Sequence, residues 1–462
     1  MIDFKKVRRV YFIGIKGVAM AGLAIILKQR KFIVSGSDTG DVFVTDKLLK
    51  KNNIKFNKKF DPINIDTFNP DLVVVGTSFS QKNLETLYAQ KKKIPILLDS
   101  ELRGILSKSK KTIAVSGMHG KTTITAWLSY IFNKSQRQPS YLIGAAGVIG
   151  LTTPAAWDTG DYFIVEADEY VKSQKEKVAK FLDLQSDITI ISGIEWEHVD
   201  VYKDIGAVKK MFAQLINQTK KNKGKIVACL DSPAVRSLVK GRQDIESYGY
   251  SRDARWKAYD LDYNGHVTSF DVLLSGKKIG RYEISLMGEH NVLNALACIV
   301  VCKLCRIPEV KIKRLLRQFK GVERRFQVQY KKKIIFVDDY GHHPTEIRAT
   351  LRAIQQKYYD RFIWCVFQSH TISRTKALLP KFAKAFFYSD KVLVTDIFES
   401  AREKNLKFKA PSLARAILRT GQKVEYTGNL EQTTQYLRAN VKAGDVVVTM
   451  GAGDIYKLIK MF

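Results

Sequence analysis

The sequence predicts an α/β protein with three domains: a Rossmann-like N-terminal domain, a central P-loop ATPase-type domain and a Rossmann-like C-terminal domain. Strand-like runs alternate with helical stretches over residues 1–107, a phosphate-loop sequence opens residues 108–320, and the alternation restarts over residues 321–462. A chain of 462 residues is also too long for one ordinary hydrophobic core.

The first domain is predicted to be doubly wound, with parallel strands at 10–15, 32–38, 71–76 and 94–98. Its first turn, from Gly14 through Gly17 to Ala19, lacks the second and third glycines of the G-x-G-x-x-G dinucleotide turn. Asp38 ends the next strand, where an acidic residue can meet a ribose hydroxyl. The turn therefore indicates a diphosphate-containing ligand without requiring a nicotinamide.

Residues 5–27 begin with basic residues and continue as an apolar run, a pattern that resembles a signal peptide. Lys16 and three glycines interrupt the run, and a second strand follows it. A strand, a glycine turn, a helix and a strand explain all of these residues. We therefore expect a cytoplasmic protein, and five cysteines without paired spacing favour a reducing compartment.

The central domain is predicted to bind nucleotide phosphates at Gly117-Met118-His119-Gly120-Lys121-Thr122. A strand precedes this loop and a helical pattern follows it, so backbone N–H groups and a helix N-terminus would face the anion. Lys121 would act as a point charge, and a hydroxyl group would bind Mg²⁺. Val115 stands where the full Walker pattern has its first glycine.

Two acidic clusters follow at predicted strand ends, where open α/β sheets bind ligands. They comprise Glu166, Asp168 and Glu169, and then Glu195, Glu197, His198 and Asp200. Carboxylates and an imidazole beside Lys121 and Thr122 suit Mg²⁺ bridging nucleotide oxygens, with a possible second cation. Glu166 and His198 are the favoured metal ligands. The alternative, a set of acidic caps at helix starts, fits Asp168 or Asp200 individually.

Cys298, Cys302 and Cys305 have a C-x₃-C-x₂-C spacing that also occurs in iron–sulfur sites. They continue a helical pattern over 290–305, where this spacing places them on one apolar face. We therefore expect buried packing residues. An antiparallel stretch at 270–286 precedes this helix, and a second helix is predicted at 308–319.

The third domain is predicted to have strands at 334–340, 362–368, 391–397, 423–427 and 445–454. Arg324 and Arg325, just before it, offer forked donors for phosphate oxygens. Asp338 and Asp339 end a buried strand and could accept from a ribose. Pro344 is expected to start a helix, which leaves His342 and His343 in the preceding turn.

The net charge of +32 raises the alternative of an RNA-binding ATPase that hydrolyses ATP without ligation. The lysines are scattered over predicted turns and strand edges, and no helix face collects them with interleaved aromatics. A solvated basic surface is the favoured interpretation.

Taken together, these motifs resemble the Mur ligase family, the ATP-dependent amide-bond-forming enzymes of peptidoglycan precursor synthesis. The resemblance covers essentially the whole chain. It lies in "GMHGKTT", "EADE", "EHVD", "GEHNVLNALA", "DDYGHHPTEIRATL", "HTISRT" and "TMGAGDI".

The resemblance implies ATP and Mg²⁺ as cofactors, with UDP-N-acetylmuramate and L-alanine as the other small-molecule partners. It assigns UDP-sugar binding to the first domain, ATP to the second and the amino acid to the third. A monomer or dimer is expected, with no nucleic acid and no membrane insertion. The implied catalytic residues are Lys121, His198, His343, His370 and Arg374. The implied ATP-binding residues are Gly117, His119, Gly120, Lys121, Thr122, Thr123, His290, Asn291, Asn294, Arg325 and Asp339. The implied sugar-substrate residues are Gly14, Gly17, Ser37, Asp38, Ser78, Tyr340 and His342, and the implied metal ligands are Thr122, Glu166 and His198.

The chain departs from the family pattern at Lys16, Ala19, Gly193 and Thr371. The middle segment 166–181 resembles the branch that attaches a recycled tripeptide, whereas the C-terminal motifs resemble the branch that adds L-alanine. The C-terminal domain selects the amino acid in this family, so L-alanine is the expected acceptor and the tripeptide the alternative.

Overall fold

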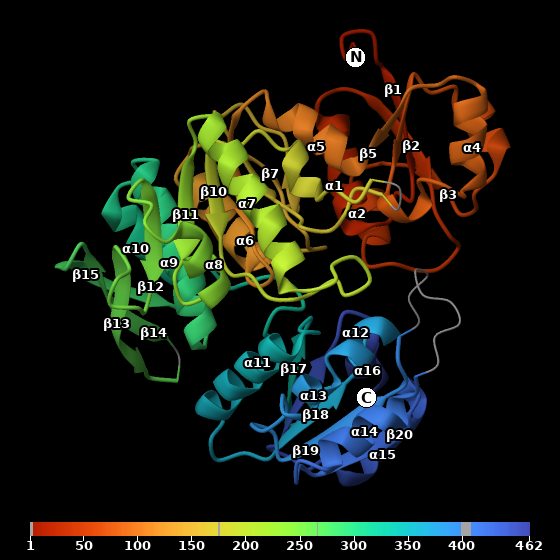
Figure 1. Ribbon diagram of the computed structural model, residues 1–462. Helices are drawn as coiled ribbons and strands as arrows, with labels where there is room; N and C mark the ends of the chain where they lie inside the picture. Colours follow the sequence, from red (N-terminus) through yellow and green to blue (C-terminus); the bar gives the residue numbers. More distant parts are fainter. Residues whose placement is uncertain (1–2, 174–175, 266, 399–407) are drawn as a thin grey trace.

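The computed structural model describes residues 3–173, 176–265, 267–398 and 408–462. Three sheets occupy three successive stretches of the chain, which confirms the predicted α/β class. The first and central lobes lie side by side, red-orange and yellow-green, and the blue C-terminal lobe lies below both (Figure 1). Among the described residues, no helix is both long enough and apolar enough to cross a bilayer.

The first sheet is parallel, with the strand order β3-β2-β1-β4-β5 of a Rossmann-like fold. The apolar run near the N-terminus forms β1, a turn and the buried helix α1, as predicted. The strands are β1 (Arg9–Ile13), β2 (Ile33–Ser37), β3 (Phe56–Asn57), β4 (Leu72–Val75) and β5 (Ile96–Leu98). The helices are α1 (Val18–Gln29), α2 (Asp46–Lys51), α3 (Pro62–Phe68), η1 (Thr77–Phe79), α4 (Leu84–Lys91) and α5 (Asp99–Ser107).

The central sheet has the order β15-β14-β13-β12-β11-β10-β6-β9-β7-β8. It is parallel from β13 to β7, and β13, β14 and β15 form the antiparallel extension expected at 270–286. The strands are β6 (Lys111–Ser116), β7 (Ser140–Leu142), β8 (Ala155–Ala156), β9 (Tyr162–Glu166), β10 (Ile188–Ile191), β11 (Lys225–Cys229), β12 (Ile245–Gly249), β13 (Trp256–Tyr263), β14 (Thr268–Leu274) and β15 (Lys277–Ile284). The helices are α6 (Lys121–Lys134), η2 (Lys180–Asp183), α7 (Ile205–Lys221), α8 (Pro233–Val239), α9 (Glu289–Leu304) and α10 (Glu309–Gln318).

Helix α9 carries the cysteine pattern, and its middle is buried on all sides. Cys298 and Cys302 are completely buried, and Cys305 forms the C-cap. All five cysteines are free and belong to the hydrophobic core. Burial raises the pKa of the Cys298 and Cys302 thiols well above the ordinary value. These are packing residues, as the helical spacing predicted.

The C-terminal sheet has the order β16-β17-β21-β18-β19-β20 and is parallel except for the edge strand β16. Its strands are β16 (Gln327–Lys331), β17 (Ile334–Asp339), β18 (Ile363–Phe367), β19 (Lys391–Thr395), β20 (Val424–Gly428) and β21 (Val446–Met450). Its helices are α11 (Pro344–Lys357), α12 (Ile372–Ala377), α13 (Leu379–Ala383), α14 (Ala410–Leu418), α15 (Leu430–Asn440), η3 (Ile455–Lys457) and α16 (Leu458–Met461). Pro344 starts α11, as predicted.

Candidate active site

The phosphate loop joins β6 to α6 at the carboxyl edge of the central sheet, where parallel α/β sheets bind ligands. Gly117 and Gly120 have φ angles of +121° and +81°, which favour glycine. A Cβ on Gly117 would lie 2.3 Å from Ser192 Oγ, and one on Gly120 would lie 2.4 Å from Asn294 Oδ1. Both glycines are therefore required by close contacts with neighbouring elements as well as by the turn.

Lys121 bends back over the loop and pairs with an acidic residue. Its Nζ donates to the Gly117 carbonyl at 2.6 Å and lies 2.9 Å from Glu169 Oε2. Burial alone would lower the pKa of Lys121, but Glu169, Glu197 and Asp168 outweigh it and raise that pKa. The lysine is thus a fixed positive charge at the start of α6.

His198 lies with two buried carboxylates in an arrangement that fits a divalent cation. His198 Nε2 is 3.0 Å from Glu169 Oε1, and ligand atoms of Glu169, Glu197 and His198 all lie within 4.8 Å of one another. The φ of His198 is +53°, an uncommon value for a residue with a Cβ. A set of two carboxylates and one imidazole suits Mg²⁺ or a similar cation.

The other predicted metal ligand, Glu166, ends β9 and is not part of this three-ligand cluster. Its Oε1 accepts from the Gly144 backbone N–H at 2.6 Å. Burial raises its pKa, although that hydrogen bond, Lys121 and the hydroxyl of Thr122 act against the rise. Glu166 and Thr122 therefore form a second oxygen-rich position beside Lys121.

The alternative that Asp168 or Asp200 caps a helix is wrong. The helices that follow, η2 and α7, have Ala179 and Asp204 as their N-caps. Asp168 instead accepts from the Tyr170 backbone N–H at 3.0 Å, and Asp200 accepts from the Tyr170 hydroxyl at 2.6 Å. Asp168 lies just after β9, and Asp200 lies in the long connection from β10 to α7, so neither residue starts a helix.

His119, in the middle of the phosphate loop, lies between carboxylates of two domains. Its Nε2 is 3.6 Å from Glu195 Oε1, and its Nδ1 is 3.2 Å from Glu346 Oε1. Burial would lower the pKa of His119, but the two carboxylates outweigh it and raise that pKa to about 10. The loop therefore carries a second positive charge.

Glu346 was absent from the predicted site, yet it organises the start of α11. It accepts from the backbone N–H groups of His342 and His343, at 3.0 and 3.3 Å, within a capping box. Its position three residues after the N-cap His343 is the sequence signal that could have revealed it. His343 is completely buried, and burial lowers its pKa to about 4, so this imidazole is neutral at pH 7.

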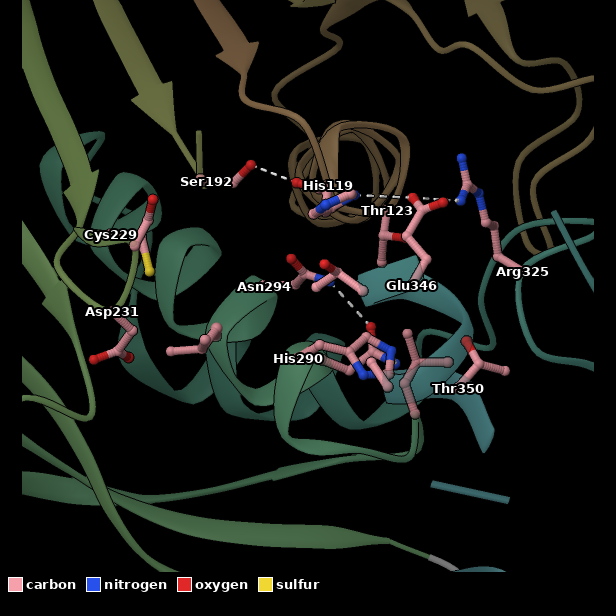
Figure 2. Close-up of a pocket in the computed structure, with 18 of the residues that line it drawn as sticks. His119, Thr123, Ser192, Cys229, Asp231, His290, Asn294, Arg325, Glu346 and Thr350 are labelled. Carbon is pink, nitrogen blue, oxygen red and sulfur yellow. Dashed lines mark hydrogen bonds and ion pairs between the residues drawn. The ribbon is translucent and has the colours of Figure 1, made fainter. Parts of the chain in front are cut away.

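Three cavities lined by described residues adjoin the phosphate loop. Cavity 1, of about 330 Å³, lies between the central and C-terminal domains, with His119 over Glu346 and with Asn294 and His290 facing them from α9 (Figure 2). The structure places most of the predicted ATP-binding residues on its wall: His119, Gly120, Thr123, His290, Asn291, Asn294, Arg325 and Asp339. Gly120, Arg325 and Glu346 also line cavity 2, so the two cavities adjoin at the loop.

Cavity 2, of about 310 Å³, contains the charged groups suited to phosphoryl chemistry. Its lining includes Arg103, Lys121, Thr122, Glu166, Asp168, Glu169, Glu197, His198, Arg325, Tyr340 and His342. Cavity 3, of about 540 Å³, lies between the loop that precedes α2 and the C-terminal domain, and Tyr340 and Arg325 line it as well.

The predicted sugar-substrate residues of the first domain contact other residues of the same domain. Asp38 accepts from the backbone N–H groups of Lys16 and Thr39, at 2.7 and 2.8 Å, and the Ser37 hydroxyl donates to Glu85. Gly14 lies under the ring of Phe79, with a φ of +81°. Gly17 is the N-cap of α1, and Ser78 lies in η1.

Lys16 is buried, and its side chain is turned toward the loop after β2. Its ammonium donates to the carbonyls of Thr39 and Asp41, at 2.8 and 2.6 Å, and lies near the rings of Phe43 and Phe56. The side chain therefore fastens the loop after β2 to the first turn.

The two arginines before β17 have different surroundings. Arg324 donates to the carbonyls of Gly451 and Gly453 and pairs with Asp338, so it braces the C-terminal fold. Arg325 faces all three cavities. Both carboxylate oxygens of Asp339 already accept backbone N–H groups, although the residue lines cavity 1.

The three residues predicted to share an amino-acid pocket have different partners. Arg374 Nη2 lies 3.3 Å from Glu197 Oε1, and His343 Nδ1 lies 3.6 Å from Glu195 Oε2. His370 stacks on Phe398, with ring centroids 5.5 Å apart. A pocket formed by all three therefore stays a prediction.

Family models match the chain along its length. They are the Mur ligase family catalytic domain at residues 9–111, the Mur ligase middle domain at 115–302 and the Mur ligase glutamate ligase domain at 324–453. The chain belongs to the Mur ligase family.

Two of its relatives are both named UDP-N-acetylmuramate–L-alanine ligase. A UDP-N-acetylmuramate–L-alanine ligase of Acetivibrio thermocellus is 39% identical, with all of this chain and 97% of the relative covered. A ligase of the same name from Caldanaerobacter subterraneus subsp. tengcongensis is 35% identical over 100% of this chain and 98% of its own.

Solved structures have the same three-domain fold. The UDP-N-acetylmuramate–alanine ligase of Thermotoga maritima aligns with a TM-score of 0.83 at 22% identity, covering 98% of both chains. The murein peptide ligase of Psychrobacter arcticus aligns with a TM-score of 0.72 at 21% identity, also over 98% of both. At these identities the structures establish the fold alone.

Proposed function

We propose that this enzyme joins L-alanine to the carboxylate of UDP-N-acetylmuramate at the expense of ATP. The observation that carries the proposal is the junction of cavities 1 and 2 at Gly120 of the phosphate loop. A nucleotide that entered cavity 1 with its base could extend its phosphates past Lys121 into the acidic cavity 2. The full-length relatives that bear this activity in their names support the same proposal.

The chemistry follows from the weak reactivity of a free carboxylate. A carboxylate oxygen attacks the γ-phosphorus of ATP, the bond from that phosphorus to the bridging oxygen breaks, and ADP leaves. The amine of alanine then attacks the acyl carbon. The tetrahedral intermediate collapses to an amide and inorganic phosphate, and the amine loses a proton.

Two anions meet in the first step, so the site needs positive charge more than a covalent nucleophile. Lys121 and the protonated His119 are positive charges on the loop itself. Glu169, Glu197 and His198 fit one Mg²⁺, and Thr122 with Glu166 fits another. When bound, Mg²⁺ would supply charge neutralisation for the phosphate oxygens.

The acceptor is proposed to bind at the C-terminal domain, near Arg374. Its guanidinium is buried and pairs with Glu197, while Nε and Nη1 have no hydrogen-bond partner among the described residues. Buried donors of this kind suit the α-carboxylate of an amino acid. The boundaries near residues 107 and 320 are proposed as the hinges of domain closure.

Phosphate release with UDP-N-acetylmuramate and ATP tests the proposal, with L-alanine, L-serine, glycine and the tripeptide L-Ala-γ-D-Glu-meso-diaminopimelate supplied separately. The highest kcat/KM is expected for L-alanine. A higher value for the tripeptide would make this a recycling ligase. Phosphate release that does not depend on the sugar nucleotide and is stimulated by RNA would favour the RNA-binding ATPase.

A further inference from the structure

Arg103 brings a positive charge from the first domain to cavity 2. The residue lies on α5 and is 5% exposed. Of the described residues that line cavity 2, those from the first domain are Val18, Ala19 and Arg103. Arg103 is the charged member of these three, and it shares the cavity with Lys121 and Thr122 of the phosphate loop.

Helix α5 is held firmly against the central domain. A Cβ on Gly104 would lie 2.5 Å from the Asp183 carbonyl oxygen, so the helix backbone packs directly on η2. The Ser107 hydroxyl accepts from the Gln185 backbone N–H at 3.0 Å. The position of α5 relative to the phosphate loop is therefore set by contacts between the two domains.

A buried ion cluster orients the guanidinium. Arg103 Nη2 donates to Asp99 Oδ2, and Nε donates to the Asp99 carbonyl at 3.4 Å. Lys180 Nζ donates to the same carboxylate oxygen at 3.2 Å. Arg103 Nη1 has no hydrogen-bond partner among the described residues, so part of the fork is available to a ligand in cavity 2.

We propose that Arg103 binds the carboxylate of the sugar substrate and so selects sugar nucleotides that carry one. The proposal rests on the proposed function, in which this carboxylate meets the γ-phosphoryl group at Lys121. Lys121 and Arg325 pair with carboxylates that themselves line the cavity, Glu169 at 2.9 Å and Glu346 at 3.8 Å. The carboxylate that pairs with Arg103, that of Asp99, is not among the residues that line it. A guanidinium matches the planar geometry of a carboxylate.

The test is equilibrium binding of two sugar nucleotides to the full chain by calorimetry. UDP-N-acetylmuramate carries the carboxylate, whereas UDP-N-acetylglucosamine has the same nucleotide and lacks it. Arg103→Met should weaken binding of UDP-N-acetylmuramate by about 10- to 100-fold, the usual loss for a hydrogen bond to a charged group, and leave UDP-N-acetylglucosamine nearly unchanged.

Lys180→Met is the matched control, because Lys180 contacts the same Asp99 oxygen but is not among the residues that line cavity 2. It should keep the preference for UDP-N-acetylmuramate. The Arg103→Met variant could fail to fold because Asp99 loses a buried partner. In that case the double variant Asp99→Asn/Arg103→Met, which removes both charges, is compared with Asp99→Asn alone.

An unchanged preference in the Arg103 variants would overturn the inference, as would an equal loss for both sugar nucleotides in Arg103→Met and Lys180→Met. Equal binding of the two sugar nucleotides by the wild type would also overturn the inference, whereas a wild-type protein that binds neither would overturn the proposed function.

Discussion

The Lys121 ammonium lies 2.9 Å from Glu169 Oε2, so the cation of the phosphate loop already has an anionic partner. The other oxygen of the same carboxylate lies 3.0 Å from His198 Nε2. An incoming phosphate must therefore compete with Glu169 for Lys121, and a cation at Glu169 would weaken the existing pair. This coupling makes Glu169 the link between nucleotide binding and the proposed metal position.

Lys121→Ala should abolish measurable phosphate release, because its charge offsets repulsion at the γ-phosphoryl group. Loss of one such electrostatic donor typically costs on the order of 10²-fold or more in kcat. Lys134→Ala, at the other end of α6, serves as the control. Near-wild-type turnover in a folded Lys121→Ala variant would remove the loop from the mechanism.

Glu166→Gln, His198→Ala and Glu169→Gln should each raise the Mg²⁺ concentration that gives half-maximal phosphate release. His198→Ala removes an imidazole nitrogen, and the two Glu→Gln variants remove a carboxylate charge, each from one of the two proposed metal positions beside Lys121. Asp200→Asn is the control, because Asp200 accepts from the Tyr170 hydroxyl and is outside the three-ligand cluster. Mg²⁺ titrations that match the parent for all three variants would place the metal elsewhere.

Gly120→Ala should destabilise the protein more than Gly276→Ala. The two glycines have φ angles of +81° and +83°, but only a Cβ on Gly120 would meet a neighbour, whereas nothing lies within 4 Å of one on Gly276. The left-handed backbone alone should cost about 1–2 kcal/mol of unfolding free energy in both variants. Urea denaturation measures the loss of unfolding free energy in each variant. Equal losses in Gly120→Ala and Gly276→Ala would show that the Asn294 side chain can move away from the new methyl group without cost.

The stabilising effect of His119 should depend on pH. Its pKa is raised to about 10 in the folded protein by Glu195 and Glu346, above the unfolded value near 6.5. The folded state then binds more protons between these values, so the stabilisation is fully present below about pH 6.5 and is lost as the pH rises through about 10.

Unfolding free energies of the wild type and His119→Gln, measured across this range, should converge at the alkaline end. A difference that stays constant with pH would mean that His119 is neutral in the folded protein.

Arg374→Ala should raise the KM for L-alanine at least about 10-fold, the usual effect of losing a hydrogen bond to a charged group, and change the KM for ATP little. The other groups on Glu197 include His342, whose Nε2 lies 3.4 Å from Glu197 Oε1. His342→Gln therefore controls for a general disturbance of Glu197. Equal changes in the KM values for L-alanine and ATP in Arg374→Ala would mean that Arg374 maintains the structure of the site and does not bind alanine.

The fold class, the loop between β6 and α6 and the packing role of the α9 cysteines could be predicted from the amino-acid sequence. These features are local: alternating strand and helix patterns, a glycine turn before a helix, and cysteines at helical spacing produce the same structure wherever the segment lies. The acidic residues after β9 and β10 could also be placed at the sheet edge, because parallel strands bring their carboxyl ends to one side.

Which of these side chains contact one another became apparent from the packing of the three domains. Glu169 rather than Glu166 pairs with Lys121 and His198, Glu346 reaches His119 across a domain boundary, and Arg103 enters cavity 2 from the first domain. Asp38 proved to be held by backbone N–H groups, and Arg324 by carbonyls. Such partners are distant in sequence and depend on how three domains pack and how each side chain turns, and local sequence patterns do not encode this.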